Sequence, residues 1–273
     1  MASKPQKLPR HLWQDMTTYE FRTPDVVNWI AILPIAAIEQ HGPHLPVATD
    51  RLINEGYLAH MLSLLPDSIP ATVLPVQAIG KSNEHISSPG TLTFNWETVT
   101  RAWIEIGDSV ARAGVKKLVI VNSHGGNVPI HDIVARELRV KHDMLVVSTA
   151  WSRLGHPEGL YGDHDRRFGI HGGEIETSLM LALHPDLVHM EKAENFRSAQ
   201  ENFEQEFKHL RAHGTSQFGW KAQDLNEQGT VGDASIATAT KGLASLDYGA
   251  RRFIELLEDV NKFDMERLWT PTS

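Results

Sequence analysis

Four short apolar segments separated by helical patterns constrain the fold of this chain more than any other feature of its sequence. The segments are rich in Val, Ile and Leu and do not alternate between apolar and polar residues, which is typical of strands buried on both faces. They span residues 29–38, 71–79, 116–122 and 144–150. Because helical patterns lie between them, we expect parallel strand pairing with right-handed crossovers. The sequence therefore predicts an α/β fold with a mainly parallel central sheet.

Helical patterns fill most of the remaining chain. The predicted helices span 51–65, 97–113, 129–142, about 173–184 and 245–262. The charged segment 186–228 is different, with an exposed helix predicted over 195–213 and a loop after it. Because no Pro/Ser-rich linker separates this segment from the rest, we predict one domain, residues 1–273. In that domain, segment 186–228 is expected to be an excursion or lid.

The composition excludes several classes of function. The chain of 273 residues has a formal net charge of −8, a pI of about 6.0 and no basic run, which argues against a nucleic-acid binder. It contains no Cys, so any metal must be held by His, Asp and Glu. No apolar run reaches the ~20 residues of a membrane span, and the N-terminal residues lack the apolar core of a signal peptide. We therefore expect a cytoplasmic protein with no nucleic-acid or membrane partner.

Polar side chains follow three of the four predicted strands. Glu39 and His41 follow the first strand, and their spacing of two places both on one face of an extended chain. His124 follows the third strand, next to two glycines that let the backbone approach a ligand. Glu174 follows the fourth, in the segment GIHGGEIETS. Because ligands collect beyond the carboxyl ends of parallel strands, we expect these side chains to meet there.

Asp50, at the start of the predicted helix 51–65, has two candidate roles. It could cap that helix, a position that Asp favours. It could also complete a set of five N/O ligands whose three carboxylates neutralise a pair of dications, and a bridging carboxylate is usual in two-metal hydrolases. We favour the bridge. The predicted metal ligands are Glu39, His41, Asp50, His124 and Glu174.

Five segments, in the right order, resemble the creatininase superfamily of amidohydrolases. They are LPIAAIEQHGPHLPVATD, GKSNEHISSPGTLT, IVNSHGGN, HGGEIETSLML and GTVGDASIATATKG, and they cover most of residues 28–243. The resemblance implies a three-layer α/β/α fold and a homohexamer built as a trimer of dimers. It implies a binuclear site held by the same five residues, with two divalent ions per chain: Zn foremost, with Mn or Fe as alternatives at one site. The implied activity is hydrolysis of a C–N bond in a small amide, formamide or cyclic amide by metal-activated water.

Two departures point away from creatinine as the substrate. Creatininase proper carries a metal-binding Glu two residues after the His of its Asn-Gly-His segment, where this chain has Gly126. It also carries a Glu directly before His-Gly-Gly and a Trp-Asp shortly upstream, where this chain has residues 167–170, RFGI. With Glu174 free to replace the missing ligand, the chain looks more like the deformylase and peptidase branches. These include archaeal formamide hydrolases of flavin biosynthesis and the mycofactocin-maturation peptidase.

Two residues of the segment HGGEIETS are assigned catalytic roles. His171, the histidine nearest Glu174 that is not itself a predicted ligand, is expected to protonate the leaving nitrogen. Glu176, two residues past Glu174 on the predicted helix, is expected to point away from the metals and to orient a ligand histidine. Glu84 and His85 either line the pocket or belong to a polar loop.

Other functions stay open at this stage. Within the hydrolases, the alternatives are creatininase proper, a peptidase of the mycofactocin-maturation type, or a mononuclear enzyme in which Asp50 only caps its helix. Outside them, the alternative is a catalytically inactive metal-binding partner subunit, although retention of all five ligands and His171 argues against it. A dinucleotide-binding enzyme is disfavoured, because no GxGxxG motif follows the first strand.

Overall fold

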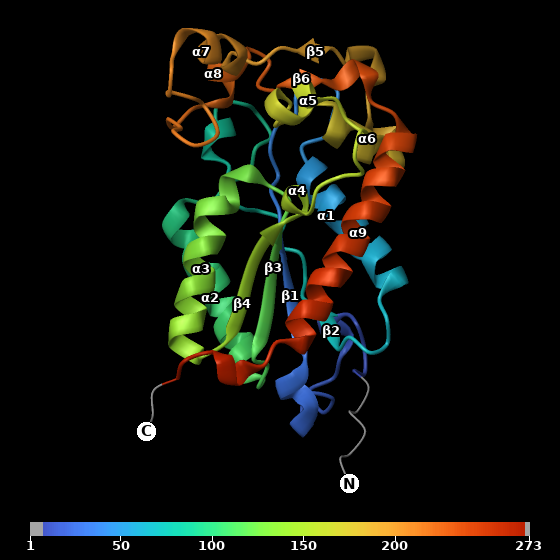
Figure 1. The fold of residues 1–273 in the computed structure, drawn as a ribbon, viewed down its shortest axis with the longest axis vertical. Helices are drawn as coiled ribbons and strands as arrows, with labels where there is room; N and C mark the ends of the chain where they lie inside the picture. The colour runs from blue at the N-terminus through green and yellow to red at the C-terminus, as the bar shows by residue number, and fades with distance from the viewer. Residues whose placement is uncertain (1–7, 271–273) are drawn as a thin grey trace.

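The structure, a computed structural model, describes residues 8–270 and has a four-stranded parallel sheet at its centre (Figure 1). The strands are β1 (Ile30–Ile35), β2 (Ala71–Val73), β3 (Lys117–Asn122) and β4 (Leu145–Ala150), in the order β2-β1-β3-β4. The predicted parallel sheet is therefore confirmed. Ile35, Asn122 and Ala150 are paired across the three longer strands, so these strands end at the same level.

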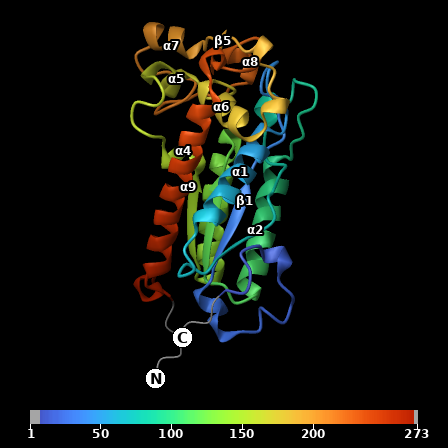
Figure 2. The ribbon, with the colours of Figure 1, turned by 90° about the vertical axis from the view of Figure 1, so that its right-hand side faces the viewer.

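Helices cover both faces of the sheet, which confirms the α/β/α arrangement (Figures 1 and 2). One layer contains α1 (Thr49–Leu64), α6 (Glu174–Leu183) and α9 (Ala239–Lys262), and the other contains α2 (Trp96–Arg112) and α3 (Val128–His142). Every residue of β1 and β3 is buried, as the absence of alternation predicts. Along β1, Ile30 and Ile32 pack into the first layer, while Ala31 and Leu33 pack into the second.

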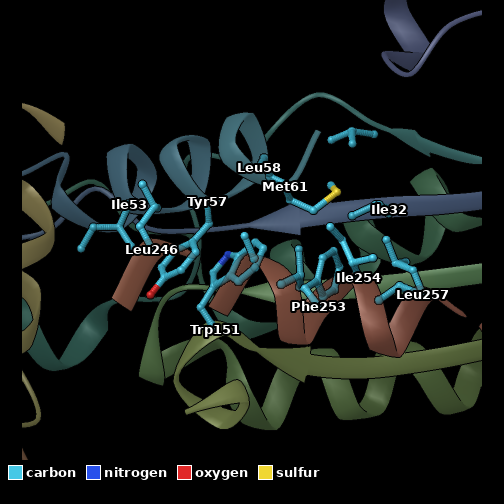
Figure 3. Close-up of a cluster of buried hydrophobic side chains, with 14 of the residues drawn as sticks. Ile32, Ile53, Tyr57, Leu58, Met61, Trp151, Leu246, Phe253, Ile254 and Leu257 are labelled. Atoms are coloured by element: carbon cyan, nitrogen blue, oxygen red, sulfur yellow. The ribbon is translucent and has the colours of Figure 1, made fainter. Parts of the chain in front are cut away.

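Large aromatic side chains fill the core between the sheet and the α1–α9 layer (Figure 3). Tyr57 of α1 stacks on Trp151, with ring centroids 4.4 Å apart and planes 9° apart. Phe253 of α9 packs against the same indole at 4.9 Å. The indole nitrogen of Trp151 donates a hydrogen bond to Asn54 Oδ1 at 3.1 Å, so its polar atom is satisfied inside the core. The end of β4 is thereby joined to α1 and α9.

Several element boundaries differ from the sequence prediction, and two of these differences have clear physical reasons. The second strand ends at Val73, because Pro75 has no N–H to donate to a neighbouring strand. Helix α9 begins at Ala239, six residues before the predicted start, because the hydroxyl of Thr238 accepts a hydrogen bond from Lys241 N and caps it. Gly242 is a poor helix former and therefore hides the start of α9 in the sequence. The position nevertheless has to be glycine, because a Cβ there would lie 1.9 Å from Ser178 O.

Short elements lie beyond the carboxyl ends of the strands (Figure 1). The helices there are α4 (Trp151–Leu154), α5 (Asp163–Phe168), α7 (Gln200–Glu206) and α8 (Ala222–Leu225); β5 (Asn195–Phe196) pairs antiparallel with β6 (Gly232–Asp233). The exposed helix predicted over 195–213 is thus only the seven residues of α7. Ala212 and Leu225 of segment 186–228 form a small apolar cluster with Val231, which lies just beyond the segment. That it belongs to one domain with the core and acts as a lid stays a prediction.

Single turns of 3-10 helix occur in several of the connections. They are Trp13–Asp15, Pro24–Asn28, Asn83–His85, Gly125–Asn127, Pro185–Leu187, Met190–Lys192, Ala234–Ile236 and Met265–Arg267. Among residues 8–270, no helix combines the length and the apolar character that crossing a membrane requires.

The aromatic core yields a prediction of stability. Phe253→Ala should lower the free energy of unfolding by about 3–5 kcal/mol, because it leaves a cavity against Trp151. Val140→Ala, at a position 75% exposed on α3, should change it by less than about 0.5 kcal/mol. Urea unfolding of both variants measures the difference, and equal midpoints would show that the aromatic cluster does not support the fold.

Candidate metal centre

The connection from β1 to α1 brings three predicted ligands together. This loop folds back on itself, because Glu39 N donates to Val47 O at 2.8 Å. The fold-back places the side chains of Glu39 and His41 beside Asp50 in the first turn of α1. Glu39 and His41 are 0% exposed and Asp50 is 2% exposed. Three ionisable groups are therefore held in the interior, where unpaired charge is costly.

The turn after β3 brings in the fourth predicted ligand. The Asn122 side chain holds this turn: its Oδ1 accepts from His124 N at 3.0 Å and its Nδ2 donates to His124 O at 2.5 Å. Asn127 anchors the other end of the turn, with Nδ2 donating to Ala36 O at 3.0 Å. His124 is 5% exposed. Polar side chains of the segment NSHGGN thus fix the position of its histidine.

The distances between these side chains define two groups that share Asp50. In the first, His124 Nδ1 lies 3.1 Å from Glu39 Oε1 and 3.4 Å from Asp50 Oδ2. In the second, His41 Nε2 lies 3.6 Å from Asp50 Oδ1 and 3.8 Å from Glu176 Oε2. The two oxygens of one carboxylate therefore face two different histidines, which is the arrangement of a bridging ligand.

The alternative that Asp50 caps α1 is wrong. The N-cap residue of α1 is Ala48, and no side chain accepts a hydrogen bond at this cap. Asp50 lies two residues further along the helix, and its carboxylate faces His41 and His124. Its charge is favourable there for a second reason, because the N-terminal end of a helix carries partial positive charge.

The hydrogen bonds of three histidines fix which ring nitrogen carries the proton. His41 Nδ1 donates to Glu39 O at 3.0 Å, His124 Nε2 to Lys81 O at 2.9 Å, and His171 Nε2 to Gln40 O at 2.7 Å. Because a carbonyl oxygen only accepts, the other nitrogen of each neutral ring presents a lone pair. These lone pairs face carboxylate oxygens of the cluster. Two acceptors that face each other repel unless a cation or a proton lies between them.

Several polar atoms of this cluster are buried without a hydrogen-bond partner among residues 8–270. They are both carboxylate oxygens of Glu39, His41 Nε2 and Asp50 Oδ2. Buried polar atoms in proteins are almost always satisfied, so these atoms require an explanation. Divalent cations with nitrogen and oxygen ligands, such as Zn²⁺ and Mn²⁺, would satisfy all of them. The donor set therefore fits the metal ions that the sequence predicts.

The pKa values of His41, His124 and Glu176 also show that positive charge is favourable in this cluster. Burial opposes protonation of His41, but the carboxylates of Asp50, Glu176 and Glu39 raise its pKa to about 10. For His124, burial is likewise outweighed by Glu39 and Asp50, and its pKa lies well above the ordinary value. Burial raises the pKa of Glu176 to about 7. Without a metal, His41 and His124 hold protons, so metal ions and protons compete for the same nitrogen atoms.

The structure does not bring Glu174 into this cluster. Its buried carboxylate forms an ion pair with Lys241 of α9. Two residues further on, Glu176 points toward His41, so the prediction that Glu176 points away from the metal ligands is wrong. Residues two apart on a helix are separated by roughly 200°, so only one of the two can face the cluster. The sequence does not distinguish the two glutamates; the ion pair between Glu174 and Lys241 does so only in the folded chain.

His171, predicted to be catalytic, lies against the ligand cluster. Its ring centroid is 4.2 Å from that of His41 and 4.3 Å from that of His85, and its Nδ1 is 3.7 Å from Glu39 Oε1. Burial and the neighbouring His41 and His85 hold the pKa of His171 well below its ordinary value.

The loop containing Glu84 and His85 also reaches the cluster. His85 Nε2 lies 3.4 Å from Glu39 Oε1, and Glu84 Oε1 lies 3.4 Å from His124 Nε2. The sequence left these two residues undecided between a pocket and a polar loop. Placing them required the three-dimensional path of the chain between β2 and α2.

A cavity of about 710 Å³ opens beside the cluster. His124 and Glu176 contribute to its lining, and Tyr57, Trp151 and Leu179 form part of an apolar wall. Small-molecule sites in proteins typically have volumes of about 300–1,000 Å³ and this mixture of apolar walls and few polar groups. The cluster therefore adjoins a space large enough for a substrate.

Comparison with known proteins identifies the family. Residues 14–257 match the family model Creatininase, described as creatinine amidohydrolase. The match spans most of the chain, and the protein belongs to the creatininase family of hydrolases.

Individual relatives differ in the reactions that their names describe. A mycofactocin precursor peptide peptidase from Mycobacterium ulcerans is 30% identical over 252 residues, which cover 89% of this chain and 87% of the relative. A creatinine amidohydrolase from Pseudomonas putida is 32% identical over 179 residues, covering 60% and 67%. A crystal structure of creatinine amidohydrolase (creatininase) superposes with a TM-score of 0.76 at 26% identity, covering 93% of this chain and 99% of that chain.

Solved creatininases also include different metal forms. A mutant described as Zn-Zn type matches with a TM-score of 0.74, covering 91% of this chain and 97% of its own. A structure described as Creatininase Mn matches with a TM-score of 0.75, covering 91% and 98%. Both are 25% identical to this chain.

The two glutamates of α6 provide a matched test of the cluster. Glu176→Gln should reduce the amount of bound divalent metal, because a neutral amide replaces the carboxylate that faces His41. Glu174→Gln should leave metal binding unchanged and lower the free energy of unfolding by about 1–3 kcal/mol, because Lys241 loses its charged partner. Elemental analysis of dialysed protein and urea unfolding measure the two effects. The reverse pattern would return Glu174 to the ligand set.

Proposed function

We propose that this protein is a binuclear metal-dependent amidohydrolase that cleaves a C–N bond in an amide, formamide or short peptide. Membership of the creatininase family gives the hydrolase class. The observation that carries the proposal is the arrangement of Asp50, whose two carboxylate oxygens face His41 and His124 in a buried cluster of unsatisfied polar atoms. The proposed ligands are Glu39, His41, Asp50, His124 and Glu176, and zinc or manganese suits their chemistry.

Divalent cations bound by these residues would lower the pKa of a water molecule toward neutrality and polarise a carbonyl group. The side chains of this chain would bind these cations and are oriented for it by their own hydrogen bonds. The hydrogen bonds to Glu39 O and Lys81 O fix the rings of His41 and His124 with their lone pairs directed toward the carboxylates. Asp50, Glu39 and Glu176 supply negative charge that would offset most of the charge of the cations.

His171 is proposed to move the proton that the leaving nitrogen needs. Its Nε2–H is held by Gln40 O, so the ring is oriented and Nδ1 is free. In this position Nδ1 faces Glu39 at 3.7 Å, on the side of the ring that faces the ligand cluster. A histidine beside the reacting groups can accept a proton from water and donate it to a leaving amine.

The size of the cavity favours a substrate larger than creatinine. Its volume of about 710 Å³ far exceeds a single small ring, and its apolar wall includes the stacked Tyr57 and Trp151. Gly126 stands where creatininase proper has a Glu, and this difference also argues against creatinine as the substrate. Hydrolysis of a short peptide is therefore the second candidate, in agreement with the relative from Mycobacterium ulcerans, which covers more of this chain than the creatinine amidohydrolase from Pseudomonas putida does.

One observation supports the predicted self-association. Four large apolar side chains are exposed on the stretch 86–96, between the loop of Glu84 and the start of α2: Ile86, Leu92, Phe94 and Trp96. Such groups on a protein surface are typical of interaction sites. The homohexamer stays a prediction.

A substrate screen tests the proposal. Protein reconstituted with Zn²⁺ or Mn²⁺ should hydrolyse at least one class among formamides, cyclic amides, ureas and short peptides. Chelation of the metal should abolish turnover. Asp50→Asn should reduce turnover by more than the ~100-fold that loss of an outer hydrogen-bond partner of a metal site costs, because both groups lose their shared carboxylate.

The same variant provides the control for folding. Asp50→Asn should keep the circular dichroism spectrum of the wild type and bind fewer metal ions. Undiminished turnover in this variant, or turnover that survives chelation in the wild type, would contradict the proposed function.

A further inference from the structure

The backbone of Gly126 is covered by the carboxylate of a residue that is distant in sequence. A Cβ at position 126 would lie 2.1 Å from Glu84 Oε1, 2.5 Å from His124 Nε2 and 2.5 Å from the backbone oxygen of Lys81. Gly126 is absent from the glycines with positive φ, so its backbone conformation does not require glycine. The glycine is therefore needed for space, and Glu84 fills that space.

The loop of Glu84 is anchored firmly enough to hold this carboxylate in place. Lys81 N donates to Asn127 Oδ1 at 2.9 Å, and Ser82 N donates to Thr93 Oγ1 at 2.8 Å. Lys81 Nζ lies 3.7 Å from the second oxygen, Glu84 Oε2. The side chain of Glu84 is only 13% exposed. The position of its carboxylate is therefore set by the fold rather than by solvent.

Glu84 lies within reach of the first ligand group. Ligand atoms from Glu39, Glu84 and His124 all lie within 4.8 Å of one another, a spacing that one metal ion can span. His124 does not need Glu84 as a hydrogen-bond acceptor, because its Nε2–H already donates to Lys81 O at 2.9 Å. The ring is therefore oriented without Glu84, whose carboxylate is the third candidate ligand group of this set.

We infer that Glu84 is an additional carboxylate ligand of the metal position that Glu39 and His124 share. The inference rests on the proposed function. In this chain, a glutamate from the loop between β2 and α2 fills the space that a side chain at position 126 would otherwise occupy. The metal centre is then completed by a segment some forty residues away from His124 in sequence, and Gly126 must stay small so that Glu84 can approach.

The test compares the number of bound metal ions, and their affinity, between wild type and variants of Glu84. The measurements are the metal content of dialysed protein and the metal affinity in competition with a chromogenic chelator. Wild type should hold about two ions per chain, as expected for a two-metal centre. Glu84→Gln should hold about one, with the affinity for the second ion lowered by more than the roughly 100-fold that loss of an outer hydrogen-bond partner costs. Glu137→Gln, an exposed carboxylate on α3, should behave as wild type.

A conservative variant separates a ligand role from a structural one. Glu84→Asp keeps the carboxylate but shortens the side chain, so its affinity for the second ion should lie between those of wild type and Glu84→Gln. Two ions at wild-type affinity in Glu84→Gln would overturn the inference. If Glu84→Gln does not fold, Glu84→Asp decides: a lowered affinity for the second ion supports the inference, and wild-type affinity for both ions overturns it. Fewer than two ions in the wild type would count against the proposed binuclear centre itself.

Discussion

The structure depends on a group of carboxylates and imidazole lone pairs that face one another in the interior. Such a group is unstable by itself, because acceptor atoms repel and buried ionised groups lose their hydration. The backbone carbonyls that accept from His41 and His124 enforce the arrangement by fixing the tautomer of each ring. The protein therefore holds a site whose electrostatic balance requires positive charge, from protons on the histidines or from cations. This requirement connects the fold to the chemistry.

The α/β/α architecture makes this group possible. Because Ile35 and Asn122 are paired at the ends of β1 and β3, the chain segments that follow both strands begin at the same edge of the sheet. Helices α1 and α6 begin at that edge as well, and their first turns contain Asp50 and Glu176. Helix N-termini stabilise negative charge, which offsets part of the cost of burying these carboxylates. The aromatic core around Trp151 anchors β4 and contributes a wall of the adjacent cavity.

Sequence reasoning succeeded where a local pattern has one structural meaning. Unbroken runs of Val, Ile and Leu predicted the parallel strands, and the positions of Glu39, His41 and His124 directly after strands predicted that these residues meet. It failed for Glu174 and Glu176, because both belong to the first turn of one helix and the sequence does not show how that helix is rotated about its axis. Packing against α9 decides this rotation, and Lys241 is the charged residue that pairs with the glutamate on the far side.

By itself, the sequence determined the layered α/β fold, the side chains available to bind metal and the absence of thiolate ligands, because these follow from composition and from periodicity along one chain. Tertiary structure alone decided which carboxylates complete the cluster. The rotation of α6 directs Glu176 toward His41, and a loop some forty residues away in sequence brings Glu84 to His124. The physical reason is that a metal site requires atoms within a few ångströms of one another, and contacts at that scale depend on packing between distant segments.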